Sequence, residues 1–166
     1  MKIILETERL ALREFTLDDA SFIIALLNTP GWLKYIGDRN VKSVEDAKKY
    51  LQNGPMKSYE ENGFGLMMVL LKEGMIPAGM CGIIKRASLE HPDIGFAFLP
   101  QFTGKGYATE IATATMDYAK NKLQLPVIFG ITLPENIRSI QLLEKSGLQF
   151  EKNIIMDKEE LMLFKG

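Results

Sequence analysis

The chain has 166 residues, of which 20 are Lys or Arg, 21 are Asp or Glu and one is His, so its formal net charge is −1 at pH 7. This balance excludes a strongly basic nucleic-acid arm, and a single cysteine excludes both an internal disulfide and a cysteine-rich zinc site. We expect one domain over residues 1–166, with no metal and no nucleic-acid partner. The apolar run that begins the chain ends at Glu6 and is too short for a signal peptide, so we expect no membrane segment and a location in the cytoplasm.

The first strand and the first helix are predicted from short-range patterns. Leu10 and Leu12 recur with a period of two, which predicts a strand over residues 9–15. Thr16 precedes two acidic residues and an apolar pattern with a spacing of four, so it is the expected N-cap of a helix. This helix should end before Pro30, because proline disfavours helical backbone in the residue that precedes it.

A second helix and a run of strands are predicted next. Ser43 is the expected N-cap of the helix, with Asp46 in position for a capping box, and Gly54-Pro55 either ends or interrupts it. Short apolar runs separated by glycine-containing turns then predict a β-hairpin and a third strand. These strands are expected over Phe64–Leu71, Pro77–Ile84 and Ile94–Leu99, and Pro100 closes the last of them.

The C-terminal part returns to a helical period and then to strands. A helix is predicted over residues 106–123, a strand over residues 127–131, and a second helix from Asn136 to a left-handed glycine cap at Gly147. Two final strands are expected around residues 148–150 and 161–164. The resulting order, β-α-α-β-β-β-α-β-α-β-β, predicts a single α+β domain.

The segment that is most informative about function joins a strand to a helix near residues 99–110. Gly104 and Gly106 permit positive φ and leave the backbone open to a ligand. The amides of the turn and of the first helical turn lack intrahelical acceptors, so they can bind a phosphate; a turn that uses glycine for geometry alone is the alternative. A P-loop does not fit, because Gly106 follows Lys105 where a hydroxyl is needed, and a dinucleotide fingerprint lacks its third glycine at Thr109.

Residues 101–106 read Gln-Phe-Thr-Gly-Lys-Gly and match every specified position of the acyl-CoA loop of GNAT N-acetyltransferases, Gln/Arg-x-x-Gly-x-Gly/Ala. The chain resembles this family from Glu6 to Phe164, and in particular the branch that contains the ribosomal-protein alanine acetyltransferases RimJ and RimL. Three further segments carry this resemblance: Thr7–Arg13, Asp93–Phe96 and Asn136–Leu148, the last with Leu148 in place of the usual phenylalanine.

The resemblance implies a GNAT fold of class α+β, with a mixed central sheet of about six to seven strands flanked by about four helices. It also implies that the strand ending at Leu99 diverges from the strand beginning near Val127, and that acetyl-CoA, the acyl donor, lies between them. The pantetheine arm would pair with the backbone of the first strand, and the pyrophosphate would meet the amides of the glycine turn. The residues assigned in this way to acetyl-CoA are Phe96, Phe98, Leu99, Gln101, Gly104, Lys105, Gly106, Tyr107, Ala108 and Asn136.

The reaction that the resemblance implies is direct transfer of the acetyl group, in a ternary complex, to a primary amine of a protein N-terminus or a small molecule. By the family pattern, Ser139 protonates or stabilises the departing thiolate, and Asp93 deprotonates the amine through a water. Many relatives use a tyrosine in place of the serine, and Asn136 and Ser139 could be only a helix cap and a solvated residue. Asp93 could equally be a surface acid or attract a cationic amine, and a water wire with no dedicated base stays open.

A non-catalytic acyl-CoA-binding or sensing domain of the same fold is the rival function. The remaining residues of interest have mainly structural expectations: Glu110 is structural, the lone His91 is inert, Cys81 packs in the core, and Trp32, Tyr35 and Tyr59 lie in the segment that would cover the acceptor side. Pairing of two copies about a twofold axis through edge strands is also expected.

Overall fold

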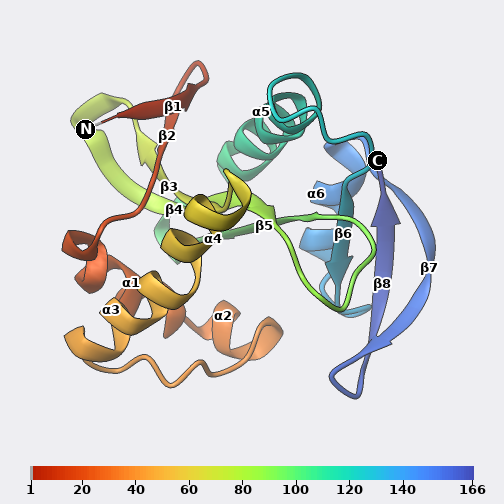
Figure 1. Ribbon diagram of the computed structural model, residues 1–166, viewed down its shortest axis with the longest axis horizontal. Coiled ribbons are helices and arrows are strands. Elements are labelled where there is room, and N and C mark those ends of the chain that lie inside the picture. Colours follow the sequence, from red (N-terminus) through yellow and green to blue (C-terminus); the bar gives the residue numbers. More distant parts are fainter. Residues whose placement is uncertain (1) are drawn as a thin grey trace.

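The computed structural model describes residues 2–166, which form one mixed β-sheet with helices on both of its faces (Figure 1). The strands are β1 (Ile3–Glu6), β2 (Leu10–Arg13), β3 (Leu66–Leu71), β4 (Ile76–Ile84), β5 (Asp93–Phe98), β6 (Phe129–Thr132), β7 (Gln149–Met156) and β8 (Glu159–Lys165). The α-helices are α1 (Ala20–Leu27), α2 (Pro30–Tyr35), α3 (Val44–Asn53), α4 (Pro55–Asn62), α5 (Tyr107–Asn121) and α6 (Ile137–Lys145), with 3-10 turns η1 (Leu17–Asp19), η2 (Glu73–Met75) and η3 (Pro100–Phe102).

The two predicted capping residues of the N-terminal half are confirmed. The side chain of Thr16 caps η1, and the carboxylate of Asp19 accepts the Thr16 amide at 2.9 Å in return. The hydroxyl of Ser43 accepts the Asp46 amide at 3.1 Å, and the Asp46 carboxylate accepts the Ser43 amide at 3.3 Å. Both helix starts are therefore stabilised by contacts within four residues of sequence, and for this reason the local sequence was enough to predict them.

The number of helices exceeds the expected four because two further helices begin at Pro30 and Pro55, where the sequence predicted only the end or the interruption of a helix. The first stretch ends at Leu27, and a new helix begins at Pro30, with the hydroxyl of Thr29 as its cap. Gly54-Pro55 likewise interrupts the second stretch, so that α4 starts at Pro55. Proline is tolerated at the first position of a helix, where its missing N–H needs no partner, and residues 2–166 accordingly contain six α-helices.

The sheet has eight strands within the described residues, where six to seven were expected. The additional strand is β1, which pairs antiparallel with β2 although its Ile3-Ile4-Leu5 run has no alternating pattern. Strand β6 begins at Phe129 and not at residue 127, while Ile128 exchanges hydrogen bonds of 2.8 and 2.9 Å with Gly166 at the end of the chain. Both differences arise from pairing between segments, which a local pattern does not contain.

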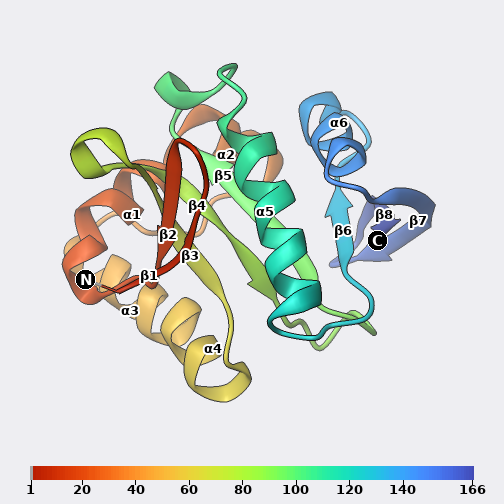
Figure 2. The same ribbon diagram turned by 90° about the horizontal axis from the view of Figure 1, so that it is seen from above.

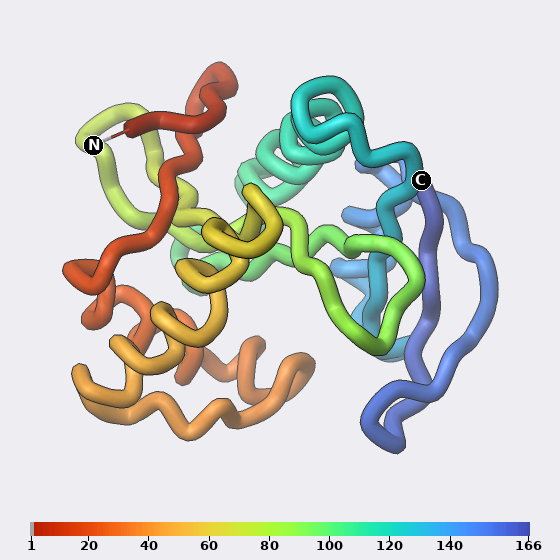
Figure 3. The backbone as a smooth tube through the Cα atoms, viewed as in Figure 1, coloured from red at the N-terminus to blue at the C-terminus, as the bar shows by residue number. Residues whose placement is uncertain are grey.

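The strands lie in the order β1-β2-β3-β4-β5-β6-β8-β7, so β1 and β7 are at opposite ends of the sheet (Figure 3). Strands β5 and β6 are the parallel neighbours in this sheet, and within residues 2–166 their register contains a single pair, Asp93 with Phe129. From that pair the two strands diverge toward their carboxyl ends (Figure 2). The predicted divergence of these two strands is therefore present.

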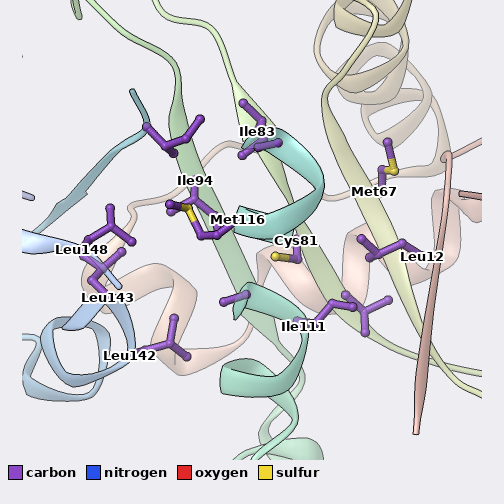
Figure 4. Close-up of a cluster of buried hydrophobic side chains, with 14 of the residues drawn as sticks. Leu12, Met67, Cys81, Ile83, Ile94, Ile111, Met116, Leu142, Leu143 and Leu148 are labelled. Carbon is purple, nitrogen blue, oxygen red and sulfur yellow. The ribbon is translucent and has the colours of Figure 1, made fainter. Parts of the chain in front are cut away.

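Two apolar clusters hold helices against the two faces of the sheet. One cluster joins α5 and α6 to the sheet through residues such as Ile111, Met116 and Leu143, which lie against strand residues such as Cys81 and Ile94 (Figure 4). The second cluster joins α1, α2 and α3 to the opposite face. No helix within residues 2–166 combines the length and apolar character needed to cross a bilayer.

Candidate functional site

The edge of β5 that faces β6 presents backbone groups beyond the single pair. The Phe129 amide donates to the carbonyl of Pro92 at 2.8 Å. Because backbone groups alternate in direction along a strand, the amide and carbonyl groups of Phe96 and Phe98 point to this same side, where the described chain supplies no paired strand. The amide of Leu99 instead donates to the carbonyl of Ala78 at 2.9 Å. An extended ligand could thus pair with Phe96 and Phe98, two of the three predicted strand residues.

The glycine turn lies at the carboxyl end of β5 and has the backbone that its sequence predicts. Gly104 has φ of 73° and Gly106 has φ of 81°, both in the left-handed region that favours glycine. Gly106 is the N-cap of the 15-residue helix α5, and no side chain of the described residues caps this helix. The first helical bond runs from the Glu110 amide to the Gly106 carbonyl, which leaves the amides of Tyr107, Ala108 and residue 109 without helical acceptors.

The outer face of this turn is open to solvent and to a ligand. Gln101, Gly104, Lys105 and Gly106 are exposed, and a Cβ placed on Gly104 would meet no atom within 4 Å. The positive end of the α5 dipole points toward this open face. Uncapped amides, a helix dipole and open space together suit a bound phosphate group.

A polar brace fixes the turn against the β1–β2 turn, which lies beside the start of α5 in Figure 2. Glu110 accepts hydrogen bonds from the Thr7 hydroxyl at 2.6 Å, the Arg9 amide at 2.9 Å and Arg9 Nε at 2.7 Å. Arg9 also donates to the Lys105 carbonyl at 3.0 Å and lies over the ring of Tyr107. Although burial alone would raise the pKa of Glu110, the hydrogen bonds from Thr7 and Arg9 hold it below its usual value. Glu110 therefore has the structural role expected of it.

Asp93 lies at the point where β5 and β6 meet and is only 1% exposed. Burial raises its pKa to about 6, against the opposing effect of Arg86. Arg86 Nε donates to Asp93 Oδ1 at 2.9 Å, while Oδ2 has no hydrogen-bond partner in the described part of the chain. Asp93 is thus not a surface acid, and one of its oxygens, Oδ2, is buried without a hydrogen-bond partner among the described residues.

Asn136 and Ser139 lie at the start of α6, which follows β6. The side-chain oxygen of Asn136 accepts the Ser139 amide at 3.3 Å, so Asn136 caps this helix. Ser139 is half-buried. The cap accounts for the Asn136 oxygen, and any contact with acetyl-CoA would use the other groups of its carboxamide.

Several other candidates have structural surroundings. The hydroxyl of Tyr59 accepts the Phe15 amide at 3.1 Å and donates to the Leu66 carbonyl, so this tyrosine joins α4 to β3 and to the segment that follows β2. Cys81 is fully buried, and burial raises the pKa of its thiol to about 12. Trp32 is also buried, and the ring of His91 packs edge-on against Phe129. None of these contacts points to chemistry.

Most of the predicted residues therefore follow one another from Asp93, at the base of the diverging strands, to the glycine turn and the start of α5, while Asn136 and Ser139 lie at the start of α6. Sequence reasoning missed Arg86, the ion-pair partner of Asp93, and the contribution of Arg9 to the turn. The strand register could have indicated Arg86. Ile84, the last residue of β4, pairs with Asp93, and Arg86 follows it by two positions, so Arg86 lies just beyond the strand end, near Asp93. Among residues 2–166 there is no group of three His, Cys, Asp or Glu side chains placed to hold a metal ion.

Known proteins resemble this chain in sequence and in fold. The family model described as an acetyltransferase (GNAT) domain matches residues 9–149. The uncharacterized N-acetyltransferase YnaD of Bacillus subtilis is 29% identical over 145 residues, which cover 87% of this chain and 82% of that protein. A GNAT-family acetyltransferase structure from Bacillus anthracis has a TM-score of 0.80 at 25% identity, covering 99% of this chain and 97% of the other. RimL, a ribosomal L7/L12 acetyltransferase solved with coenzyme A, has a TM-score of 0.84 at 14% identity, with coverage of 99% and 97%.

Proposed function

The chain belongs to the GNAT family of acetyltransferases, and on this premise we propose that it transfers an acetyl group from acetyl-CoA to a primary amine by direct attack in a ternary complex. The acceptor is a small molecule or a protein N-terminus, the active unit is one domain over residues 1–166, and the enzyme works in the cytoplasm. The observation that carries the proposal is the uncapped glycine turn that follows β5. Within the described residues, the edge of β5 that faces β6 is unpaired beyond Asp93.

Acetyl-CoA fits this site through backbone groups. The amides near Gly104, Gly106 and Ala108 receive the pyrophosphate, since uncapped helix amides favour an anion. The Phe96 and Phe98 edge receives the pantetheine arm. The neighbouring predicted residues Gln101, Lys105, Tyr107 and Leu99 border the same path, and Asn136 lies at the start of the helix that follows β6. Structural neighbours solved in complex with coenzyme A or acetyl-CoA support this choice of donor.

The chemistry needs a neutral amine and a stabilised thiolate. Acetyl-CoA supplies the activated thioester. Asp93 takes the proton of the amine through a water at Oδ2, while Arg86 holds Oδ1. Ser139 donates its hydroxyl hydrogen bond to the departing thiolate. A buried carboxylate with an unpartnered oxygen favours this catalytic role over a domain that only binds acyl-CoA, because such a group is costly to retain without use.

The experiment that separates catalysis from simple binding is release of free CoA thiol from acetyl-CoA. The panel of acceptors comprises polyamines, aminoglycosides, amino acids and ribosomal-protein N-terminal peptides. We expect at least one amine to give steady thiol release and an acetylated product of matching amount. Tight binding of CoA with thiol release that no amine increases would favour the acyl-CoA-binding alternative.

Lys105→Ala is expected to weaken CoA binding only modestly. The Lys105 side chain is exposed, so its attraction to the phosphates is screened by solvent and amounts to about 1 kcal/mol. Isothermal titration with CoA should show this small loss, and Lys120→Ala, which removes an exposed lysine from the far end of α5, should show none. A thousandfold loss for Lys105→Ala would mean that the lysine, and not the backbone, holds the phosphates.

The rate of the proposed reaction is expected to rise with pH through a pKa of about 6. The base must be ionised to accept a proton, and burial raises the pKa of Asp93 to about 6, so activity should be low below this value and level above it. Asp93→Asn keeps the shape of the side chain but cannot titrate. In this variant kcat/KM should fall and the acidic limb should disappear, while circular dichroism shows an unchanged fold. An acidic limb that persists unchanged in Asp93→Asn would favour a water wire without a dedicated base.

A further inference from the structure

An open groove of about 370 Å³ lies between the α2–α3 loop and α3, which run alongside each other in Figure 1. Loop residues Arg39, Asn40 and Val41 form one wall. Asp46, Lys49 and Tyr50 of α3 form the other, and Asn53 and Gly54 close its end. None of these residues has a role in the acetyl-CoA site described above.

The charged side chains that line this groove differ in whether they have an ion-pair or hydrogen-bond partner. Within residues 2–166, the observed ion pairs leave Arg39 and Lys49 without a carboxylate partner. The one carboxylate in the lining, Asp46, accepts the amides of Lys42 and Ser43, and these backbone hydrogen bonds hold its pKa below the usual value. The Lys42 ammonium is paired outside the groove with Asp38 at 3.4 Å. The charge of Lys49 also contributes to lowering the pKa of Asp46, although the two side chains form no ion pair. The groove therefore offers two cations, Arg39 and Lys49, against one carboxylate that is already hydrogen-bonded.

The groove is linked to the proposed base through Tyr50. Tyr50 packs against the same apolar cluster as Ala97 of β5, on the face covered by α1, α2 and α3. Alternation along β5 places the Asp93 side chain on this face as well. Burial raises the pKa of Tyr50, and the positive charges of Arg39 and Arg86 oppose this rise. Arg86 in turn holds Asp93.

We infer that this groove binds an anionic group of the acceptor, so that the acceptor is an amine that also carries a carboxylate or a phosphate. The inference rests on the proposed function and narrows its substrate class. Arg39 and Lys49 can each donate charge-assisted hydrogen bonds to such a group, while Asn40, Asn53 and the Tyr50 hydroxyl add neutral donors. The same two cations disfavour a polyamine, because like charges would be brought together.

The test compares amines that differ only in the anionic group. The pairs are arginine with agmatine, ornithine with putrescine, and phosphoethanolamine with ethanolamine; the first two pairs test a carboxylate and the third a phosphate. Thiol release from acetyl-CoA gives kcat/KM for each amine, and nuclear magnetic resonance of the CoA-saturated protein gives binding for all of them, whether or not they react. We expect the anionic member of at least one pair to have the higher kcat/KM or the tighter binding, with shifted amide signals over residues 39–54.

Matched variants connect that preference to the groove. Arg39→Gln and Lys49→Gln should each raise the KM or Kd of the anionic amine by roughly fivefold to tenfold, as expected for one charged contact, and leave the KM of acetyl-CoA unchanged. Lys48→Gln removes the same charge from α3 outside the groove lining and should have no such effect. Equal or better use of the uncharged or cationic members, or a preference that both groove variants retain, would overturn the inference. Thiol release that is stimulated by any amine supports the proposed function, whatever the groove variants show. If the anionic amines do not shift the amide signals of residues 39–54, the inference about the groove is wrong, while the proposed function is unaffected.

Discussion

Gly106→Asp is expected to abolish binding of CoA. Gly106 has φ of 81° and is the N-cap of α5, so its backbone leads directly into the uncapped amides. An aspartate here adds a negative charge next to the bound phosphates, and its side chain would also compete for the amides as a helix cap. A ligand present at about 100 times its Kd stabilises the folded state by about 2.7 kcal/mol. In a thermal melt, CoA should therefore raise the Tm of the wild type and leave that of the variant unchanged.

The left-handed backbone at this position needs its own control. Gly63 has φ of 76°, caps α4 and lies outside the site. A Cβ placed on Gly63 would meet no atom within 4 Å, whereas one placed on Gly106 would lie 3.3 Å from Arg9 Nη2. Gly63→Asp should destabilise the free protein by a similar strain, about 1–2 kcal/mol, and still respond to CoA. Gly104→Asp, with φ of 73° and an open surrounding, should lose the response as Gly106→Asp does. Wild-type CoA binding in both turn variants would remove the turn from the phosphate site.

Ser139→Ala is expected to lower turnover by roughly 10- to 1,000-fold and to leave CoA affinity nearly unchanged, because the proposed hydrogen bond to the thiolate forms mainly in the transition state. Ser139 lies in the first turn of α6, where the Asn136 cap fixes its backbone amide, so the loss of the hydroxyl should not disturb the helix start. Steady-state kcat and a CoA titration of the same preparation measure the two effects.

The same hydroxyl deletion elsewhere on this helix distinguishes chemistry from helix stability. Ser146, at the other end of α6, donates its hydroxyl to the Leu142 carbonyl at 2.7 Å. Ser146→Ala should lower Tm through the loss of a buried hydrogen bond and leave kcat of the folded enzyme near the wild-type value. Turnover of Ser139→Ala equal to that of the wild type would remove this residue from the mechanism and move the role to a tyrosine outside α6, such as Tyr107 or Tyr118.

The parts of the fold that were predictable depend on contacts between residues near in sequence. The caps at Thr16 and Ser43 form within four residues, and the left-handed turn at Gly104 and Gly106 needs only glycine. Strand β1 was not predicted, because its apolar run has no alternation and its place in the sheet is decided by pairing with β2. The structure has more helices than expected for a local reason. A proline that ends one helix can also begin the next, and the prediction treated each proline only as an end or an interruption.

The candidate site shows the same division. The glycine turn and Asp93 could be proposed as site residues because each belongs to a short continuous segment of sequence. Arg86 and Arg9 contact these segments across the β4–β5 turn and across about 100 residues of sequence. Burial also changed the interpretation of Asp93, since no pattern of charges in the sequence indicates that a carboxylate is 1% exposed. The groove beside α3 depends on how a loop packs against a helix and has no motif at all.

The most direct test of the central claim is an initial-rate study with acetyl-CoA and the best amine of the panel as the two varied substrates. Direct transfer in a ternary complex predicts double-reciprocal lines that intersect, and a protein mass that stays unchanged after incubation with acetyl-CoA alone. Parallel lines, together with a protein that gains the mass of one acetyl group before any amine is added, would contradict direct transfer and place the acetyl group on the enzyme first.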